Sequence, residues 1–238
     1  RIKEKEEILK TKIEQGFTQI IIVPFALPIT KLGEKYQETI LKHKKNNTLN
    51  ATNGDPLELD EKEPLWIWHD GYDNAEEENK IFYFPQQFDP ENHQGQTKQE
   101  MLDTQINQGW QILLIENLPD LPAKGQGQEI SGRTQIESGK TPGEYLEKIQ
   151  TNPQYQNEQG LTPEDWLIYA ITHLEETNQV IDDYRGNGKV NYNLAGYFPA
   201  SGGVARGAWG RDFQQADLGG DDVGDSASCN GFRSGVSV

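Results

Sequence analysis

Residues 201–238 read SGGVARGAWGRDFQQADLGGDDVGDSASCNGFRSGVSV, and their composition differs from that of the rest of the chain. They hold nine of its 24 glycines, among small polar residues. A disordered tail would lack the spaced aromatic and arginine residues that interrupt this run. The closing GFRSGVSV, in which Phe232 and Gly235 are followed by two valines, is typical of a terminal strand. We therefore expect a rigid frame of a few anchor residues that carries loops of small side chains.

The overall composition limits the classes of function. At 238 residues the chain is long enough for one large domain or two small ones, and its five Trp, nine Tyr and eight Phe supply bulk for a core. A net charge of −16 argues against nucleic-acid binding through phosphate neutralisation, and against binding to an anionic membrane. We therefore expect no nucleic acid as a partner.

Three further features bear on the compartment. Cys229 is the single cysteine, which excludes an intramolecular disulfide and a multi-cysteine zinc site. No apolar run approaches the roughly 20 residues of a membrane span. We recognise no signal peptide, and the sequence begins at Arg1 rather than at methionine, so the localisation stays open.

Residues 1–140 favour a mixed α/β portion. Helical spacing of apolar residues predicts helices over 2–15, 30–45 and 97–108, and Thr30 fits the cap of the second. Runs of β-branched or aromatic residues predict strands over 17–25, 64–70, 80–85 and 109–119, the first of them buried. The Gly-, Pro- and Gln-rich residues 119–141 predict a long surface loop, and we place a soft domain boundary at residue 140.

The clearest local pattern in the chain is LTPEDWLIYAITHLEETNQVID, which predicts a helix over 161–182. Thr162 fits the N-cap, Pro163 the first helical position and Asp165 the capping box. The apolar side chains that we expect on one face are Leu167, Ala170, Ile171, Leu174 and Ile181, with Trp166 and Tyr169 at its edge.

Two shorter elements flank this helix. TPGEYLEKIQ predicts a helix over 141–150 with Thr141 as its cap, and VNYNLAGYFPAS predicts a strand over 190–201. No period of 20–50 residues recurs, so a repeat architecture is not predicted. The predicted fold class is therefore α+β.

Residues suited to catalysis or to metal binding do not converge in the sequence. The histidines lack HxH or HExxH spacing, and we interpret them as surface or partly packed residues: His43, His69, His93 and His173. Cys229 lies in a Gly/Ser run with no neighbouring histidine, so we do not predict a nucleophile. Asp221, Asp222 and Asp225 cluster closely enough to leave a weak cation site open. We predict no enzymatic activity, no cofactor and no metal centre.

Two motifs together resemble the formylglycine-generating-enzyme branch of the C-type lectin fold. The helix start LTPEDWLIYA resembles that branch's PTEAEWEYAA, and GGVARGAWGRD…NGFRSGVSV resembles its VxRGGSW…GFR ending. The matching positions are Thr162, Pro163, Glu164, Trp166, Ala170, Val204, Arg206, Gly207, Trp209, Gly231, Phe232 and Arg233. The resemblance covers residues 141–238 and implies a C-type-lectin-like domain there. Residues 1–140 resemble no family that we can name.

The resemblance also implies which activities of that branch are missing. Its oxidases hold copper with a pair of cysteines, whereas this chain has Cys229 alone, and its iron-dependent sulfoxide synthases need an HxHxE motif that is absent. A chain with these two motifs but without those catalytic residues is similar to the variable proteins of diversity-generating retroelements. In those systems a reverse transcriptase rewrites adenines in a C-terminal repeat. The resemblance thus implies a non-catalytic display protein that binds an unknown protein or cell-surface ligand through a variable region, residues 201–238.

A fold that accepts many sequences must separate buried anchors from solvent-facing positions, because core substitutions cost several kcal/mol and exposed ones usually stay within about 0.5 kcal/mol. We expect Trp209, Phe213 and Phe232 to fill the core, with the Trp166 helix as a further anchor. The arginines expected to bind backbone carbonyls are Arg206, Arg211 and Arg233. The expected variable, ligand-binding positions are Ala208, Gly210, Asp217, Gly219, Gly220, Asp221, Asp222, Gly224, Asp225, Ala227, Cys229 and Asn230.

Two other functions remain open. One is a divergent enzyme of the formylglycine-generating type that acts without the cysteine pair. The other is an invariant structural or assembly protein, in which the small residues of 201–238 are ordinary turns and its glycine-rich end only packs.

Overall fold

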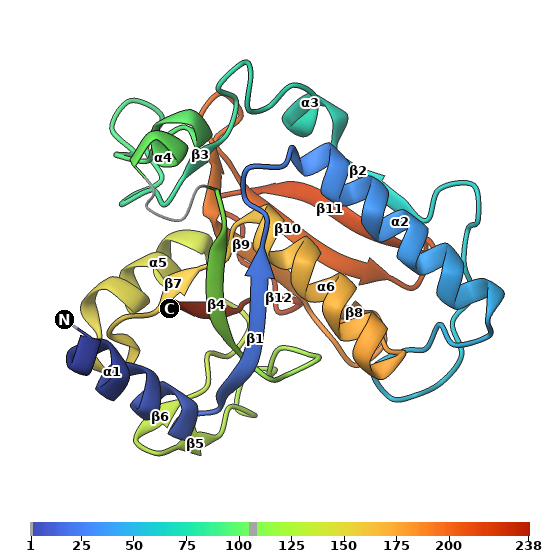
Figure 1. The fold of residues 1–238 in the computed structure, drawn as a ribbon, viewed down its shortest axis with the longest axis horizontal. Helices are drawn as coiled ribbons and strands as arrows, with labels where there is room; N and C mark the ends of the chain where they lie inside the picture. Colours follow the sequence, from blue (N-terminus) through green and yellow to red (C-terminus); the bar gives the residue numbers. More distant parts are fainter. Residues whose placement is uncertain (1, 105–108) are drawn as a thin grey trace.

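The computed structural model describes residues 2–104 and 109–238, and it has the predicted α+β class (Figure 1). Its helices are α1 (Ile2–Glu14), α2 (Ile29–Lys45), α3 (His69–Tyr72), α4 (Lys98–Thr104), α5 (Pro142–Thr151) and α6 (Pro163–Thr177), with a 3-10 turn over Pro153–Tyr155. The predicted helices over 2–15, 30–45, 141–150 and 161–182 are confirmed within a few residues, except that α6 ends at Thr177. Residues 105–108 of the predicted helix 97–108 lie outside the described residues.

The strands form two sheets and a small hairpin. The first sheet has the order β1 (Phe17–Val23), β4 (Gln111–Glu116), β13 (Ser234–Ser237) and β7 (Gln159–Gly160). The second sheet has the order β12 (Asn230–Phe232), β9 (Val190–Phe198), β10 (Gly203–Gly210), β11 (Gln215–Asp222) and β2 (Leu65–Ile67). Off this path, β3 (Phe82–Tyr83) pairs with β9 and β8 (Asp183–Tyr184) pairs with β10; the hairpin is β5 (Glu129–Ile130) and β6 (Arg133–Thr134).

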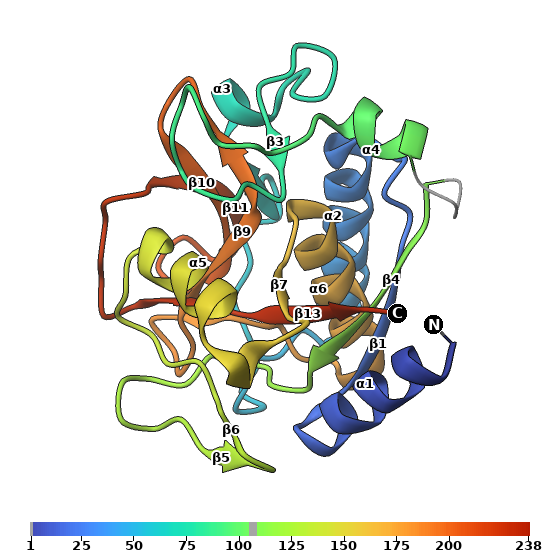
Figure 2. The same ribbon diagram turned by 90° about the vertical axis from the view of Figure 1, so that its left-hand side faces the viewer.

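Helix α6 lies between the two sheets, beside α2 (Figure 2). It begins as predicted, because Thr162 and Asp165 form a reciprocal capping box with Pro at the first helical position. Trp166 and Tyr169, which were expected at the edge of the apolar face, are instead fully buried. The reason is that α2 and β1 cover the helix on one side while β9 and β10 cover it on the other, so more than one of its faces is buried.

Other helices cover the remaining faces. Thr141 caps α5 with a second capping box, and α5 packs on the outer face of the second sheet, where the rings of Tyr145 and Phe232 lie 5.7 Å apart. α1 covers part of the outer face of the first sheet through Leu9. α2 begins after Pro28 without a side-chain cap, so the prediction for Thr30 is wrong.

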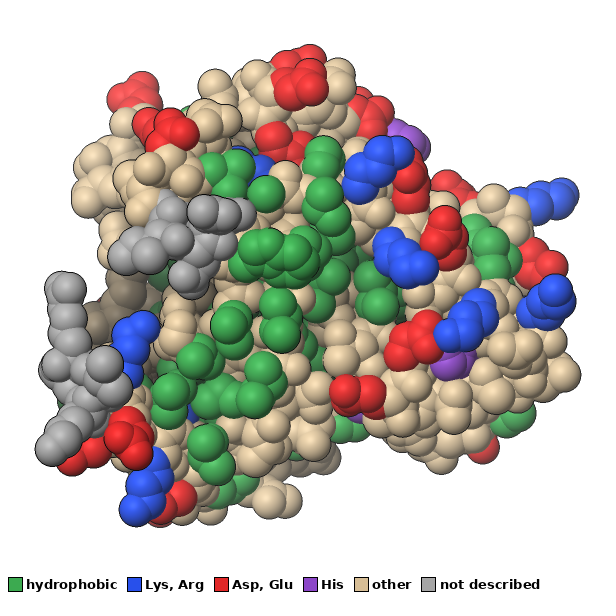
Figure 3. Space-filling view, in the orientation of Figure 1, with side chains coloured by type: hydrophobic (Ala, Val, Ile, Leu, Met, Phe, Trp, Pro, Cys, Tyr) green, Lys and Arg blue, Asp and Glu red, His purple; other side chains and the backbone are tan. Residues whose placement is uncertain are grey.

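The outer face of β1 is exposed where α1 does not reach it. Its side chains alternate between core and solvent, and Ile20 and Ile22 are 58% and 57% exposed. The prediction of a buried strand over 17–25 is therefore wrong for one of its two faces. Figure 3 shows the hydrophobic side chains that gather over β1 and β4 on this side of the molecule.

Residues 1–140 and 141–238 share both sheets. Leu114 of β4 lies opposite Val236 of β13, and Ile67 of β2 lies opposite Leu218 of β11. The main core also takes side chains from both ranges. The boundary that we placed at residue 140 therefore marks no gap in the packing.

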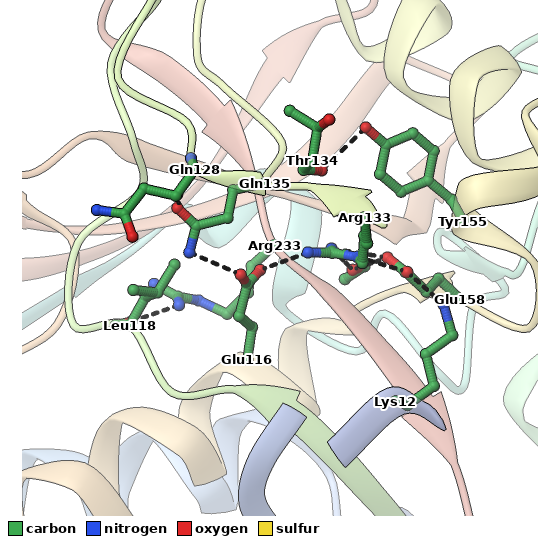
Figure 4. A network of polar contacts seen from close by, with 11 residues as sticks. Lys12, Glu116, Leu118, Gln128, Arg133, Thr134, Gln135, Tyr155, Glu158 and Arg233 are labelled. Carbon is green, nitrogen blue, oxygen red and sulfur yellow. Dashed lines mark hydrogen bonds and ion pairs between the residues drawn. The ribbon is translucent and has the colours of Figure 1, made fainter. Parts of the chain in front are cut away.

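Arg133 is buried, although it lies within residues 119–141, which were predicted to form a surface loop. The Arg133 side chain is 1% exposed and binds Glu158 through Nε at 2.7 Å and Glu116 through Nη1 at 3.2 Å (Figure 4). Lys12 of α1 reaches the same Glu158 carboxylate at 2.7 Å, and Ser234 donates a hydrogen bond to it at 2.6 Å. Burial alone would raise the pKa of Glu158, but Arg133 offsets this and holds the pKa below its usual value.

This ion network joins α1, β4, β6 and β13, so losing its central cation leaves buried carboxylates without enough positive charge. We predict that Arg133→Met lowers the free energy of unfolding by about 3–5 kcal/mol. Urea denaturation followed by tryptophan fluorescence measures this change. The matched control is Lys35→Met, which removes an exposed pair with Glu38 and should cost no more than about 1 kcal/mol. Equal losses for the two variants would contradict a supporting role for the network.

Candidate functional site

The glycine-rich run of residues 201–238 forms a hairpin of two eight-residue strands rather than a set of loops. β10 and β11 pair without interruption from Gly203 opposite Asp222 to Gly210 opposite Gln215. The irregular parts between β10 and β12 are the turn 211–214 and the segment 223–229. The expectation that loops dominate this run is therefore wrong.

Packing against tryptophan explains why small residues stand in these strands. A Cβ at Gly207 would lie 2.3 Å from the indole of Trp166, and a Cβ at Gly220 would lie 2.7 Å from the ring of Trp68. The Trp68 ring is also held by Phe198, 5.1 Å away between ring centroids, and by Gly71 beneath it. Distances below 3 Å cannot be accommodated unless an atom moves, so both glycines are required by the frame.

Arg206 organises a polar cluster on the outer face of the hairpin. It lies opposite Gly219, whose missing side chain leaves room for the guanidinium group. Arg206 Nε donates to Asp221 Oδ1 at 2.9 Å, and Nη1 lies 3.1 Å from Asp217 Oδ2. The expectation that this arginine binds backbone carbonyls is therefore wrong, because two carboxylates flank the gap at Gly219.

Asn230 extends the cluster toward β9. Its Nδ2 group donates to Asp221 Oδ2 at 3.1 Å and to the Tyr192 hydroxyl at 2.7 Å. Burial raises the pKa of Tyr192 to about 12, so the hydroxyl stays protonated and donates to the backbone oxygen of Asp225. We call Arg206, Asp217, Asp221, Asn230 and Tyr192 the Arg206 cluster.

The charges around the Arg206 cluster are mainly negative. Burial raises the pKa of Asp217, and the charge of Arg206 opposes that rise. One arginine is shared by two aspartates, while Asp222 and Asp225 stand exposed beside them. This arrangement can accept hydrogen bonds from a cationic or donor-rich ligand.

The weak cation site left open at three aspartates is not formed. Asp221 is bound by Arg206 and Asn230, and the Asp222 carboxylate accepts a hydrogen bond from the Gly224 backbone at 2.7 Å. Across residues 2–104 and 109–238, no group of three or more His, Cys, Asp or Glu side chains is placed to hold a metal ion.

Arg233 and Arg211 connect chain segments that lie outside the Arg206 cluster. Arg233, 1% exposed at its side chain, donates to the backbone oxygens of Leu118 and Pro119, as expected, and to Asp182 Oδ1 at 2.8 Å. Arg211 instead binds the carboxylate of Asp183 with Nε and Nη2 at 2.7 and 2.6 Å.

Asp182 connects the two motifs on which the family resemblance rests. Its carboxylate accepts a hydrogen bond from Trp166 Nε1 at 3.0 Å and another from Arg233. Its backbone oxygen also accepts from the backbone N–H of Trp209 at 3.0 Å. Sequence reasoning missed Asp182, because a DD pair at the end of a helix is indistinguishable in sequence from a solvated turn.

The structure divides the twelve predicted ligand-binding positions by exposure. Three are exposed: Asp222, Gly224 and Asp225. Five are half-buried: Asp217, Gly220, Asp221, Ala227 and Cys229. Four are buried and so do not belong to a solvent-facing surface: Ala208, Gly210, Gly219 and Asn230.

The predicted core anchors are confirmed with one exception. Trp166, Trp209 and Phe232 are at most 1% exposed. Phe213 is 68% exposed, which makes the prediction of a core position wrong. It lies in the turn 211–214 at the tip of the hairpin, where no other element covers it.

No protein family, no curated protein and no solved structure matches this chain. Among the helices that the structure describes, none combines the length and the apolar character needed to cross a membrane.

The contrast between packed and exposed glycines can be tested with single substitutions. We predict that Gly220→Ala lowers the free energy of unfolding by about 1–3 kcal/mol, because the new methyl group meets the confined Trp68 ring. Gly224→Ala, whose Cβ would approach only the exposed Asp222 side chain, should change it by no more than about 0.5 kcal/mol. Thermal and urea unfolding of the two variants provide the measurement. A neutral Gly220→Ala would show that this position is free to vary.

Proposed function

We propose that this chain is a non-catalytic ligand-binding protein of C-type-lectin-like fold, and that retroelement-directed variation acts on its exposed C-terminal segment. The observation that supports it most is the meeting of the two motifs at Asp182. Trp166 from the first motif and Arg233 from the second bind the two oxygens of one buried carboxylate. Trp166 and Arg233, which belong to the two separate motifs of the resemblance, are therefore joined through one side chain in this fold.

The proposed ligand-binding surface is smaller than the sequence suggested. It consists of the segment 222–229 and the accessible edge of the Arg206 cluster, because the hairpin itself is engaged in packing. Substitutions at Asp222, Gly224 and Asp225 remove no packed side chain. In the present sequence the segment 222–229 is acidic and contains no aromatic or arginine residue, whereas tight interfaces rely on aromatic and arginine anchors. We therefore expect this variant to bind weakly, and to favour cationic ligands.

A library test separates the frame from the variable surface. Randomising Asp222, Gly224 and Asp225 in the intact chain should leave most members folded, with losses within about 0.5 kcal/mol per position. Selection of that library against an immobilised test protein, such as a basic lysozyme, should yield binders. The matched library randomises the buried positions Ala208 and Gly219 and should lose most folded members, because their neighbours leave no space.

The enzyme alternative has its own readout. Copper- or iron-dependent oxidation of a cysteine-containing peptide by the purified chain, abolished in Cys229→Ser, would contradict the proposed function. An exposed-position library that folds no better than the buried-position library would contradict it as well.

A further inference from the structure

The outer face of the first sheet carries a row of exposed apolar side chains. Ile22 of β1 lies opposite Ile112 of β4, and the Val238 backbone N–H donates to the Ile112 carbonyl oxygen at 3.0 Å, so Ile112 lies between the other two. Ile20 adjoins this row two residues along β1, and Trp110 lines one cavity with Ile112 and Val238. Side chains two residues apart in a strand share one face of the sheet. We call Ile20, Ile22, Trp110, Ile112 and Val238 the outer-sheet patch.

The helix that packs on the same face of the sheet stops short of this patch. Leu9 of α1 packs against Leu114 and Val236, which lie opposite each other in the neighbouring row. The patch residues are 37–58% exposed, and they are five of the nine large apolar side chains that are exposed among the described residues (Figure 3). Exposed apolar residues are ordinarily scattered singly, so their concentration on one face indicates an interaction site.

The segments that bear the patch are uncharged. Residues 17–23, 109–115 and 234–238 contain no Asp, Glu, Lys or Arg, in a chain of which 25% is charged. Because the chain carries a net charge of −16, two copies repel each other on approach over most of their surface. At the patch, two copies can meet without burying a charge and without bringing like charges together.

The patch is large enough for the core of a dimer interface. At the exposures given above, its five residues present on the order of 500 Å² of surface, near the upper end of the roughly 300–600 Å² of the largest apolar patch on a monomer. Each partner in a standard interface contributes about 800 Å², and about 65% of a homodimer interface is apolar. The patch therefore supplies about the apolar share that a homodimer needs.

The patch combines protruding side chains with a hollow. Ile20 and Ile22 are its most exposed members, at 58% and 57%. On the other side of Ile112, an uncharged cavity of about 260 Å³ lies between Phe84, Trp110 and Val238. A two-fold axis brings the same surface of two copies together, so a protrusion and a hollow on one surface meet their counterparts twice. The surface is thus complementary to itself.

We propose that two copies of this chain form a two-fold symmetric dimer in which their outer-sheet patches pack face to face. The axis runs along β4 near Ile112, because this places Ile22 of each copy over Val238 of the other, beside the hollow. Sheets that pack face to face lie about 10 Å apart, which leaves room for interlocking side chains. A second copy fits this surface because it offers the same uncharged face, protrusion and hollow.

The dimer does not depend on the proposed display function. Its patch shares no residue with the segment 222–229. Figure 2 shows the connection between β11 and β12 on the opposite side of the molecule from β1 and β4. Two copies joined through their patches therefore carry their 222–229 segments at opposite ends, where both stay accessible.

Sedimentation equilibrium over a series of protein concentrations tests the dimer. We expect the parent chain to reach twice the mass of one chain, and Ile22→Lys to raise the dissociation constant of the dimer at least about a hundredfold by burying a charge. The milder Ile22→Thr, which keeps a β-branched residue in the strand, should raise it about tenfold. The matched control is Phe213→Lys, which adds the same charge at an apolar residue that is 68% exposed in the hairpin turn. It should leave the dimer unchanged.

Crosslinking tests the position of the axis. Cys229 is the single cysteine, so Cys229→Ser provides a background without thiols. In that background Ile112→Cys should give a covalent dimer with a short bismaleimide crosslinker, because the two copies of residue 112 face each other. Phe213→Cys in the same background should stay monomeric under denaturing electrophoresis.

Several results would overturn the proposal. A parent chain that stays monomeric at all concentrations would do so, and so would a dimer that folded Ile22→Lys and Ile22→Thr leave intact. A monomeric parent that binds vesicles of neutral phosphatidylcholine, with binding lost in Ile22→Lys, would assign the patch to a lipid surface instead. Variants at Asp222 and Asp225 should dimerise as the parent does, so failure of the proposed display function leaves this test unaffected.

Discussion

The buried carboxylate of Asp182 is the interaction on which the arrangement of the C-terminal half depends. It fixes α6 through Trp166 and the segment before β13 through Arg233, while its backbone oxygen holds Trp209 of β10. A buried ion pair that loses one partner commonly costs about 3–5 kcal/mol, so these three segments cannot easily move apart. Asp182 also adopts a left-handed backbone conformation (φ 52°), which aspartate tolerates better than most residues.

Glycines of the C-terminal region have different roles in the structure, although their side chains are the same. Gly207 and Gly220 are small because tryptophan rings occupy the space where their side chains would be. Gly224 is small in a segment where solvent would surround a larger side chain. Composition alone treats these three glycines as equivalent. The freedom to vary, which the proposed display function requires, is therefore confined to residues 222–229, which are the last residue of β11 and the segment that follows it.

Features that depend on residues close together in the sequence were predicted well, and features that depend on residues far apart in the sequence were not. The caps at Thr162 and Thr141 depend on residues within one helical turn, so the sequence identified both helices. The burial of Arg133 depends on Glu158 and Glu116, which lie far along the chain, so residues 119–141 were taken for surface loop. The hairpin β10–β11 was missed because glycine disfavours strands unless a large side chain from another element packs on it.

The proposed separation between a fixed frame and a variable segment can be tested in the DNA that flanks the gene. Sequencing should reveal a reverse-transcriptase gene beside a near-copy of the bases that encode residues 201–238, differing chiefly at adenines. We predict that the differences fall in the codons of Asp222, Gly224 and Asp225 and spare those of Gly207 and Trp209. A complete genome without either element, or a repeat whose differences fall equally on the frame codons, would contradict the proposal.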